Sequence, residues 1–262
     1  MKAITLLYHD VIESARSGES GFTSADAEIY KLSPDDFKRH LDAIATTGNV
    51  PDCTISDVMQ KGCGPPIPVL LTFDDGGASA LSTADMLDGR GWKGHFFITT
   101  GRIGTNGFLD TAGIRELAAR GHVVGSHSCS HPARISHLDD VQLSREWSAS
   151  VQALEEILGA TVDTASVPGG FYSTRVAEFA RQAGIRVLFN SEPSVRVVRN
   201  GDFAICGRFG LQRDSPPERA RLFAMRDRAT LAREAAFWNA KKLLKRAGGE
   251  QWLAFRRWWL AR

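Results

Sequence analysis

The stretch VLLTFDDG, residues 69–76, decides the fold class of this chain. Its first five residues are a continuous apolar run, which is typical of a parallel strand buried on both faces, and the acidic pair and glycine that follow are typical of a turn. Segments of strand composition and of helical spacing alternate downstream. The expected strands are residues 95–99, 122–127, 164–167 and 186–189, and the expected helices are residues 79–90, 110–119, 138–158 and 174–183. Repeated strand–helix units predict an α/β fold of parallel strands with helices outside them.

The chain has 262 residues, of which 43% are hydrophobic and 24% are charged. These values exclude a disordered protein, a collagen-like fibre and a small disulfide scaffold. About 250 residues with this alternation of strands and helices favour a single barrel over two domains. We therefore expect a barrel over residues 1–215 and a helical extension over residues 216–262, with a long loop at residues 10–30 and a Pro/Gly connector at residues 61–68.

The N-terminal segment has neither the apolar run of about 7 to 15 residues nor the cleavage site of a signal peptide. We interpret it as a buried first strand of a cytoplasmic chain, and no stretch reaches the roughly 18 to 20 apolar residues of a membrane span. In the cytoplasm we expect the cysteines to be free thiols rather than disulfides. The four cysteines, Cys53, Cys63, Cys129 and Cys206, have no zinc-ribbon spacing.

The C-terminal extension differs from the rest of the chain in charge. Residues 218–262 hold twelve Lys/Arg and four Asp/Glu, a charge of +8 in a chain whose net charge is +2, and four of the six tryptophans. One interpretation is a pair of helices that covers the open side of the barrel. The other is an interfacial helix that binds anionic lipid at the inner face of the membrane through basic and aromatic side chains. No nucleic-acid partner is expected.

Two polar clusters follow two of the expected strands. Asp74 and Asp75 end the strand at residues 69–73, and His127 and His131 end the strand at residues 122–127. Because active sites of barrels lie at the C-terminal ends of the strands, the clusters are expected to meet. Two imidazoles and a carboxylate are a common ligand set for a catalytic divalent metal with open coordination positions.

The motif LTFDDG together with the later HSxxHP motif resembles the polysaccharide deacetylase family, that is, carbohydrate esterase family four with its NodB homology domain. The resemblance covers about residues 69–189. It implies a distorted (β/α)7 barrel in which Asp74 is the general base. It also implies that Asp75, His127 and His131 bind a divalent metal, commonly zinc.

The third motif of that family, usually Arg-x-Pro, is altered here to SVPGGFY, residues 166–172. The arginine that typically pairs with the base is absent, and Arg208 in the strand-like segment AICGRFG is the candidate that could supply the positive charge. The residues expected to bind the substrate are Pro168, Gly169, Phe171, Tyr172 and Arg208.

The late Leu-x-His motif of the family, which supplies the general acid, is also absent, since no histidine follows His137. The segment Tyr8-His9-Asp10 resembles a branch of the family with circularly permuted motifs, which implies that His9 is the acid. The remaining histidines, His40, His95, His122 and His137, are interpreted as surface or packing residues.

These residues predict a metal-dependent hydrolase that removes acetyl groups from an N-acetylated sugar or an exopolysaccharide precursor, which could be lipid-linked. Two alternatives stay open. One is hydrolysis of another small, non-peptide amide such as a cyclic imide, and the other is an inactive relative that only binds glycans. The complete set of base and metal ligands argues against the second alternative.

Overall fold

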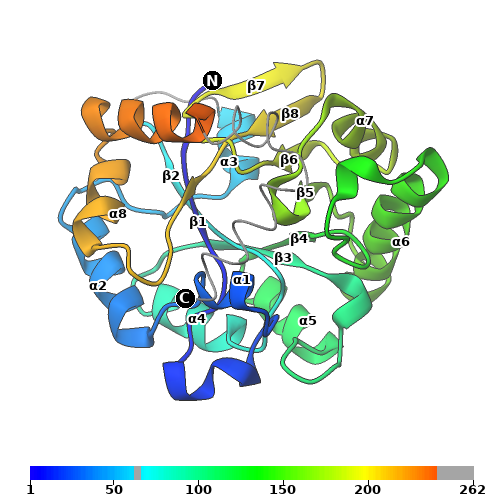
Figure 1. Ribbon diagram of the computed structural model, residues 1–262, viewed down its shortest axis with the longest axis horizontal. Coiled ribbons are helices and arrows are strands. Elements are labelled where there is room, and N and C mark those ends of the chain that lie inside the picture. The colour runs from blue at the N-terminus through cyan, green and yellow to red at the C-terminus, as the bar shows by residue number, and fades with distance from the viewer. Residues whose placement is uncertain (62–65, 241–262) are drawn as a thin grey trace.

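The computed structural model describes residues 1–61 and 66–240, and it contains one curled sheet surrounded by helices (Figure 1). The strands are β1 (Ile4–Tyr8), β2 (Val69–Phe73), β3 (Gly94–Ile98), β4 (Val123–Ser126), β5 (Thr164–Ser166), β6 (Val187–Phe189), β7 (Val197–Asn200), β8 (Phe203–Cys206) and β9 (Phe209–Gly210). Their order across the sheet is β7-β8-β6-β5-β4-β3-β2-β1-β9. The pairs from β9 to β8 are parallel, and β7 runs antiparallel to β8 at one edge.

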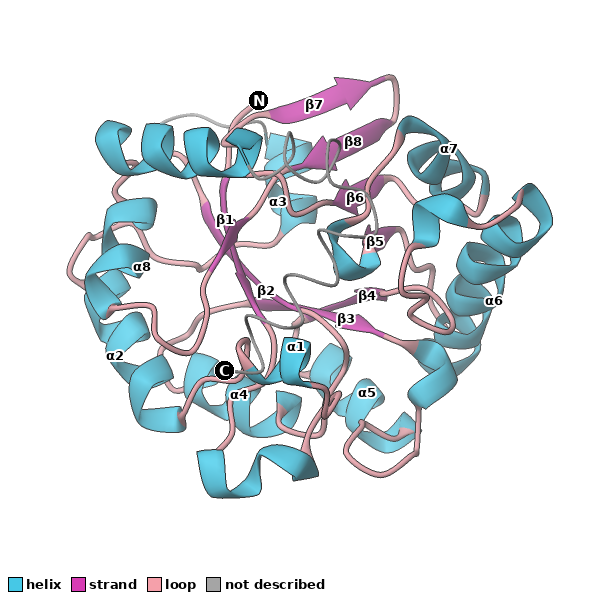
Figure 2. Ribbon diagram, viewed as in Figure 1, coloured by secondary structure: helices cyan, strands magenta, loops and turns pink. Residues whose placement is uncertain are grey.

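Helices lie on the outside of the sheet (Figure 2). They are α1 (Ala25–Glu28), α2 (Pro34–Ala45), α3 (Ile55–Lys61), α4 (Ala80–Asp88), α5 (Thr111–Ala119), α6 (Asp140–Leu158), α7 (Thr174–Gln182) and α8 (Pro217–Ala224). Short 3-10 helices span Ser14–Glu19, Thr100–Arg102, Ile135–His137 and Pro168–Gly170. Residues 228–240 form a further helix. Among the described residues, no helix combines the length and the apolar character needed to cross a membrane.

The two ends of the curled sheet approach each other at the connection between β8 and β9. β8 pairs with β6, yet only Gly207 and Arg208 separate it from β9, which pairs with β1. Since each residue spans at most about 3.6 Å, the chain passes from β8, near one end of the sheet, to β9, at the other end, in a single short step. A Cβ at Gly207 would lie 2.3 Å from the Glu192 carbonyl oxygen, so this crossing requires glycine.

Most sequence-based expectations for the elements are confirmed. All residues of β1, β2 and β3 are buried, as expected for parallel strands covered on both faces. The expected helices correspond to α4, α5, α6 and α7, and Asp110 caps α5 by accepting a hydrogen bond from the Gly113 N–H. The fold class is confirmed as the distorted barrel, in a curled form with an antiparallel edge strand.

The region before residue 69 contains more structure than the sequence interpretation assigned to it. The expected loop at residues 10–30 contains a 3-10 helix and α1, and α2 and α3 were not anticipated. Ser33 caps α2, Pro34 is its first residue, and its buried face includes Phe37. α2 packs against α8, so this helix pair depends on contacts between residues far apart in the sequence.

The C-terminal extension begins as part of the same core. Phe223 on α8 is fully buried in the main hydrophobic cluster, and Leu231 packs against that cluster from the helix at residues 228–240. The expected break at residues 248–249, and most of the basic and aromatic segment, lie outside the described residues. The division of the chain at residue 215 remains a prediction.

Candidate active site

The turn after β2 directs two adjacent carboxylates to different partners. Asp74 and Asp75 are each 5% exposed. Asp75 has a left-handed backbone (φ +78°), which is unusual for a residue with a side chain and is often found at functional sites. Gly76 follows with φ +79°, and a Cβ there would lie 3.1 Å from Ile98. The glycine of the DDG sequence is therefore required by a tight turn that packs on β3.

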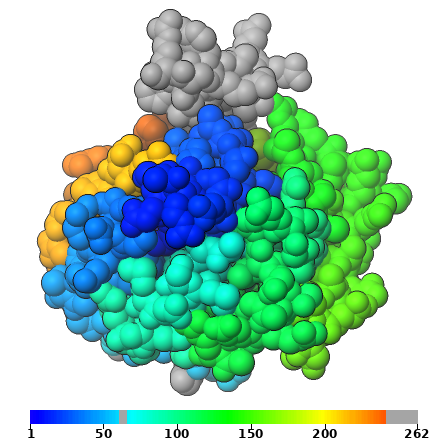
Figure 3. Space-filling view, turned by 90° about the horizontal axis from the view of Figure 1, so that it is seen from below, coloured from blue at the N-terminus to red at the C-terminus, as the bar shows by residue number. Residues whose placement is uncertain are grey.

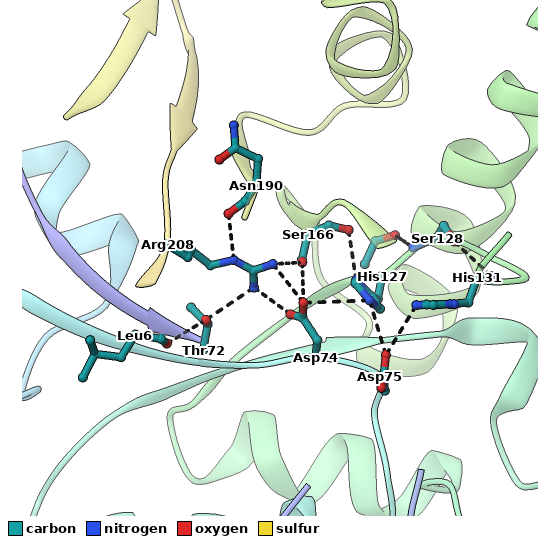
Figure 4. Close-up of polar contacts among 11 residues, drawn as sticks. Leu6, Thr72, Asp74, Asp75, His127, Ser128, His131, Ser166, Asn190 and Arg208 are labelled. Carbon is teal, nitrogen blue, oxygen red and sulfur yellow. Dashed lines mark hydrogen bonds and ion pairs between the residues drawn. The ribbon is translucent and has the colours of Figure 1, made fainter. Parts of the chain in front are cut away.

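Asp74 forms a bidentate ion pair with Arg208 (Figure 4). Arg208 Nη1 donates to Asp74 Oδ1 at 2.7 Å and Nη2 donates to Oδ2 at 2.8 Å. The Ser166 hydroxyl donates to the same Oδ2 at 3.0 Å. Arg208 thus supplies from the β8–β9 connection the positive charge that the altered third motif lacks.

The contacts of Arg208 bear on its expected role in substrate binding. The side chain is 1% exposed, and its five N–H groups are directed to protein partners: Asp74 twice, Ser166, Thr72 and the Asn190 carbonyl. A guanidinium with every donor engaged has none left for a ligand. These contacts favour a role for Arg208 in holding the Asp74 carboxylate, whereas its assignment to substrate binding remains a prediction.

Asp75, His127 and His131 form a cluster whose ligand atoms lie within 4.8 Å of one another. Asp75 Oδ1 lies 3.4 Å from His127 Nε2 and 3.6 Å from His131 Nε2. His127 Nδ1 is 3.0 Å from the Ser166 carbonyl oxygen, so this ring nitrogen carries the proton and leaves Nε2 available as a ligand. The donor set and spacing fit a divalent cation.

The loop that carries His131 is held by a contact that sequence reasoning missed. Ser130 donates to both carboxylate oxygens of Glu146 on α6, through its N–H at 2.8 Å and its hydroxyl at 2.6 Å. Ser128 and His131 have positive φ values of 62° and 54°. Glu146 lies 16 residues after Ser130, on a helix without any motif, and no local signal points to it.

The buried charged groups of the site shift one another's pKa values. Burial raises the pKa of the Asp74 carboxyl, but the Arg208 guanidinium and the His127 imidazole outweigh it and hold that pKa well below its usual range. Burial and the neighbouring His127 lower the pKa of His131 to about 4, so this ligand is neutral at pH 7, as metal binding requires. Burial lowers the pKa of His127, but the neighbouring Asp74 and Asp75 carboxylates outweigh it and raise that pKa, as in a site that attracts a cation.

His9 follows β1 directly and lines the same small pocket as Asp74. Its ring lies against Tyr30, with the ring centroids 4.5 Å apart. On the other side of the site, Phe22 lies against His131 with a centroid distance of 4.8 Å. The expected loop at residues 10–30 thus contributes two aromatic rings that sequence reasoning did not assign. Figure 3 shows this N-terminal part of the chain, in deep blue, at the surface beside the cyan and green parts.

The altered third motif forms a 3-10 turn after β5. Pro168 is buried, whereas Phe171 and Tyr172 are half-buried. Gly169 has φ +61°, and a Cβ there would lie 3.2 Å from the Phe171 ring. Burial raises the pKa of the Tyr172 hydroxyl. The assignment of Pro168, Gly169, Phe171 and Tyr172 to substrate binding remains a proposal.

Three of the other histidines lie at packing positions. His95 accepts from the Ile55 N–H and lies 3.0 Å from the Leu71 carbonyl oxygen. His40 contacts the Tyr8 hydroxyl, and His122 accepts from the Gly94 N–H. His137 is exposed.

Residues 61–188 match the sequence model of the polysaccharide deacetylase family. The match places residues 61–188, slightly less than half of the chain, in this family. The matched segment includes Asp74, Asp75, His127 and His131, whereas His9 and Arg208 lie outside it. A curated chitin deacetylase from Pestalotiopsis sp is 30% identical over 124 residues, which are 47% of this chain and 40% of that protein. The chain thus spans less than half the length of this curated relative.

Solved structures share the polysaccharide deacetylase fold. IcaB from Ammonifex degensii has a TM-score of 0.66 and 25% identity, with 86% of this chain and 97% of that chain covered. A polysaccharide deacetylase from Bacillus cereus has a TM-score of 0.70 and 16% identity, covering 88% and 69% of the two chains. The Streptococcus pyogenes deacetylase PplD, solved with acetate, has a TM-score of 0.69 and 18% identity over 86% and 98%. The last two similarities concern the fold alone.

Proposed function

We propose that this chain is a metal-dependent hydrolase that removes the N-acetyl group from an N-acetylated saccharide. The observation that carries the proposal is the arrangement of Asp74 beside a cation site. Asp74 Oδ2 lies 3.9 Å from His127 Nε2, and Arg208 binds the carboxylate from the opposite side. An ionised carboxylate next to three metal ligands is suited to accept a proton from an attacking water.

Asp75, His127 and His131 would hold the metal, for which zinc is our proposal on the basis of the ligand set. When bound, a divalent cation would polarise the acetamide carbonyl and favour ionisation of water at neutral pH. The Ser166 carbonyl orients His127, and the Glu146 carboxylate orients the loop of His131. Both contacts hold the ligands in place before a cation binds.

The two proton transfers are assigned to Asp74 and His9. Asp74 accepts the proton of the water that attacks the acetyl carbon, and Arg208 and Ser166 keep its carboxylate fixed during the transfer. His9 donates a proton to the nitrogen as the C–N bond breaks, so that the product leaves as an amine. Both groups line one small cavity, so the two side chains lie close together, as action on one acetamide group requires.

The proposal of a saccharide substrate is supported by the family match and by the aromatic rings of the third motif. The relative from Pestalotiopsis is a chitin deacetylase, which supports an N-acetylated sugar as the substrate class. Phe171 and Tyr172 are half-buried in the turn after β5, whose last residue, Ser166, contacts Asp74, and we propose that their rings pack against a sugar. An exopolysaccharide precursor is the form that we propose.

The test is acetate release by the purified full chain from N-acetylated oligosaccharides, with the bound metal measured in the same preparation. Stoichiometric metal and acetate release that a chelator abolishes and zinc restores are the expected results. Metal without acetate release would favour another small amide or cyclic imide as substrate. Neither metal nor release would favour an inactive glycan-binding relative.

We also propose that the enzyme is cytoplasmic and that its C-terminal segment contacts anionic membrane near a lipid-linked precursor. The composition of residues 218–262 supports this, as does Phe237, which is 65% exposed on the helix at residues 228–240. The test is co-sedimentation with anionic liposomes. A variant that ends at Ala240 is the appropriate comparison because it keeps the buried Phe223. Equal sedimentation of the two chains would reject the proposal.

A further inference from the structure

No hydrogen bond holds the ring of His9 within the described part of the chain. Its Nδ1 is buried and has no hydrogen-bonding partner there. The ring instead lies against the ring of Tyr30, with centroids 4.5 Å apart and planes inclined by 33°. Such a tilted stack is a favourable aromatic arrangement. A residue that transfers a proton must keep its nitrogen aimed at the reacting atom, and here the stack provides the orientation.

Tyr30 itself lies in a backbone segment that is fixed on both sides. The Ile29 carbonyl accepts from the Arg213 N–H at 2.9 Å. The Leu32 N–H donates to the Asp10 carbonyl at 3.0 Å, and the Ile12 N–H donates to the Leu32 carbonyl at 2.8 Å. Residues 10–12 directly follow His9. The two hydrogen bonds of Leu32 therefore join the segment of Tyr30 to the segment that follows His9 and fix the two backbones relative to each other.

We propose that Tyr30 is a positioning residue for His9 and that its ring holds the imidazole in the orientation needed for proton donation. This inference rests on the proposed function, in which His9 donates a proton to the leaving nitrogen. In that step the C–N bond of the acetamide breaks, its electron pair stays on nitrogen, and this pair takes the proton from His9. Because Nδ1 is enclosed, Nε2 is the nitrogen available for the transfer.

The experiment compares Tyr30→Leu with Tyr30→Phe in the metal-loaded full chain, using two substrates. One is an N-acetylated oligosaccharide, whose amine leaving group needs a proton. The other is an aryl acetate ester, whose phenolate leaves without one. We expect Tyr30→Leu to lower kcat on the amide by about 10- to 10²-fold, with KM and the ester rate little changed. Tyr30→Phe keeps the ring and should retain the amide rate.

Two comparisons separate positioning from general damage to the site. Phe22→Leu removes a ring from the same loop that faces His131, so it should affect both substrates alike. In a His9→Ala background, Tyr30→Leu should add no further loss because the residue that it positions is gone. An NMR spectrum of the metal-free protein gives a readout without catalysis. The ring-current shift of the His9 protons should be lost in Tyr30→Leu and kept in Tyr30→Phe.

The outcomes that overturn the inference differ from those that overturn the proposed function. Equal loss on amide and ester in Tyr30→Leu, an unchanged amide rate, or an additive loss with His9→Ala would each reject the role of Tyr30. A wild-type chain that releases no acetate would reject the proposed function, and full amide activity in His9→Ala would reject the acid assignment. Either of these two results would also reject the positioning role of Tyr30.

Discussion

The metal-ligand cluster and the residues that support Asp74 and His9 are assembled in different ways. Asp75, His127 and His131 come from the ends of β2 and β4, both within the segment that matches the family model. Asp74 instead pairs with Arg208, which is 134 residues away in the sequence and outside that segment. His9 stacks on Tyr30, also outside it. Short motifs thus encode the ligands, whereas closure of the sheet brings Arg208 to Asp74 and the loop after β1 brings Tyr30 to His9.

The largest expected effect is on the metal-ligand cluster. His131→Ala or His127→Ala should abolish stoichiometric metal binding, because one imidazole and Asp75 are too few ligands for a stable site. Activity should fall by more than the roughly 10²- to 10⁴-fold expected from loss of a single general base. Metal analysis after dialysis and acetate release measure the two effects. A variant with full metal and full turnover would show that the cluster is not the metal site.

Asp74→Asn tests the role of the carboxylate that Arg208 binds. The amide cannot accept a proton from water, so kcat should fall by about 10²- to 10⁴-fold while the metal stays bound. The comparison is His131→Ala, which should lose both the bound metal and the activity. If Asp74→Asn lost the metal as well, the separation between the ligand cluster and the base would be wrong.

Arg208→Lys should have a smaller effect than removal of the carboxylate. Lysine keeps the charge but cannot form the two parallel hydrogen bonds, so Asp74 is held less rigidly. We expect kcat to fall by roughly 10-fold, with KM little changed. Arg208→Met should instead destabilise the fold by about 3–5 kcal/mol, because it leaves a buried carboxylate unpaired. Steady-state kinetics and urea unfolding distinguish the two changes, and a raised KM in Arg208→Lys would support direct substrate contact.

Glu146→Gln should weaken metal binding by about 10-fold, as expected for a residue that orients a ligand. The variant replaces a charged acceptor of the Ser130 hydrogen bonds. Glu156→Gln on the same helix is the control, because Glu156 contacts Gln152 and not the loop. Competition with a chromophoric chelator measures the affinities. Equal affinities in the two variants would contradict the role of Glu146.

The smallest effect at neutral pH concerns stability. Burial lowers the pKa of His95 and of His131 to about 4, from an ordinary value of 6.5. Between these values the unfolded chain binds more protons than the folded one, so the free energy of unfolding should fall as the pH falls from 6.5 to 4. Urea unfolding of the metal-free protein measures the slope, and His95→Gln should reduce it. A constant free energy across this range would contradict the buried neutral state of these rings.

The family resemblance, together with its N-terminal branch, indicated Asp74, Asp75, His127, His131 and His9 from the sequence. Each of them lies within five residues after the end of a short strand, and in a parallel sheet the ends of the strands lie along one edge. The structure brings these residues together, while their roles remain proposals. α2 was missed although Ser33-Pro34 is a helix start signal.

The sequence by itself determined the alternating strands and helices and the two motifs, because both depend on local periodicity and on neighbouring residues. Only the tertiary structure decided that Arg208 pairs with Asp74, that Tyr30 stacks on His9 and that Glu146 holds the loop of His131. The Arg208–Asp74 pair forms because the curled sheet brings β8 close to β9, with only Gly207 and Arg208 between them. The other two contacts form where a loop folds back onto a neighbouring segment. The physical reason is that a side chain's partner across a closed sheet depends on strand order and curvature, which no local pattern encodes.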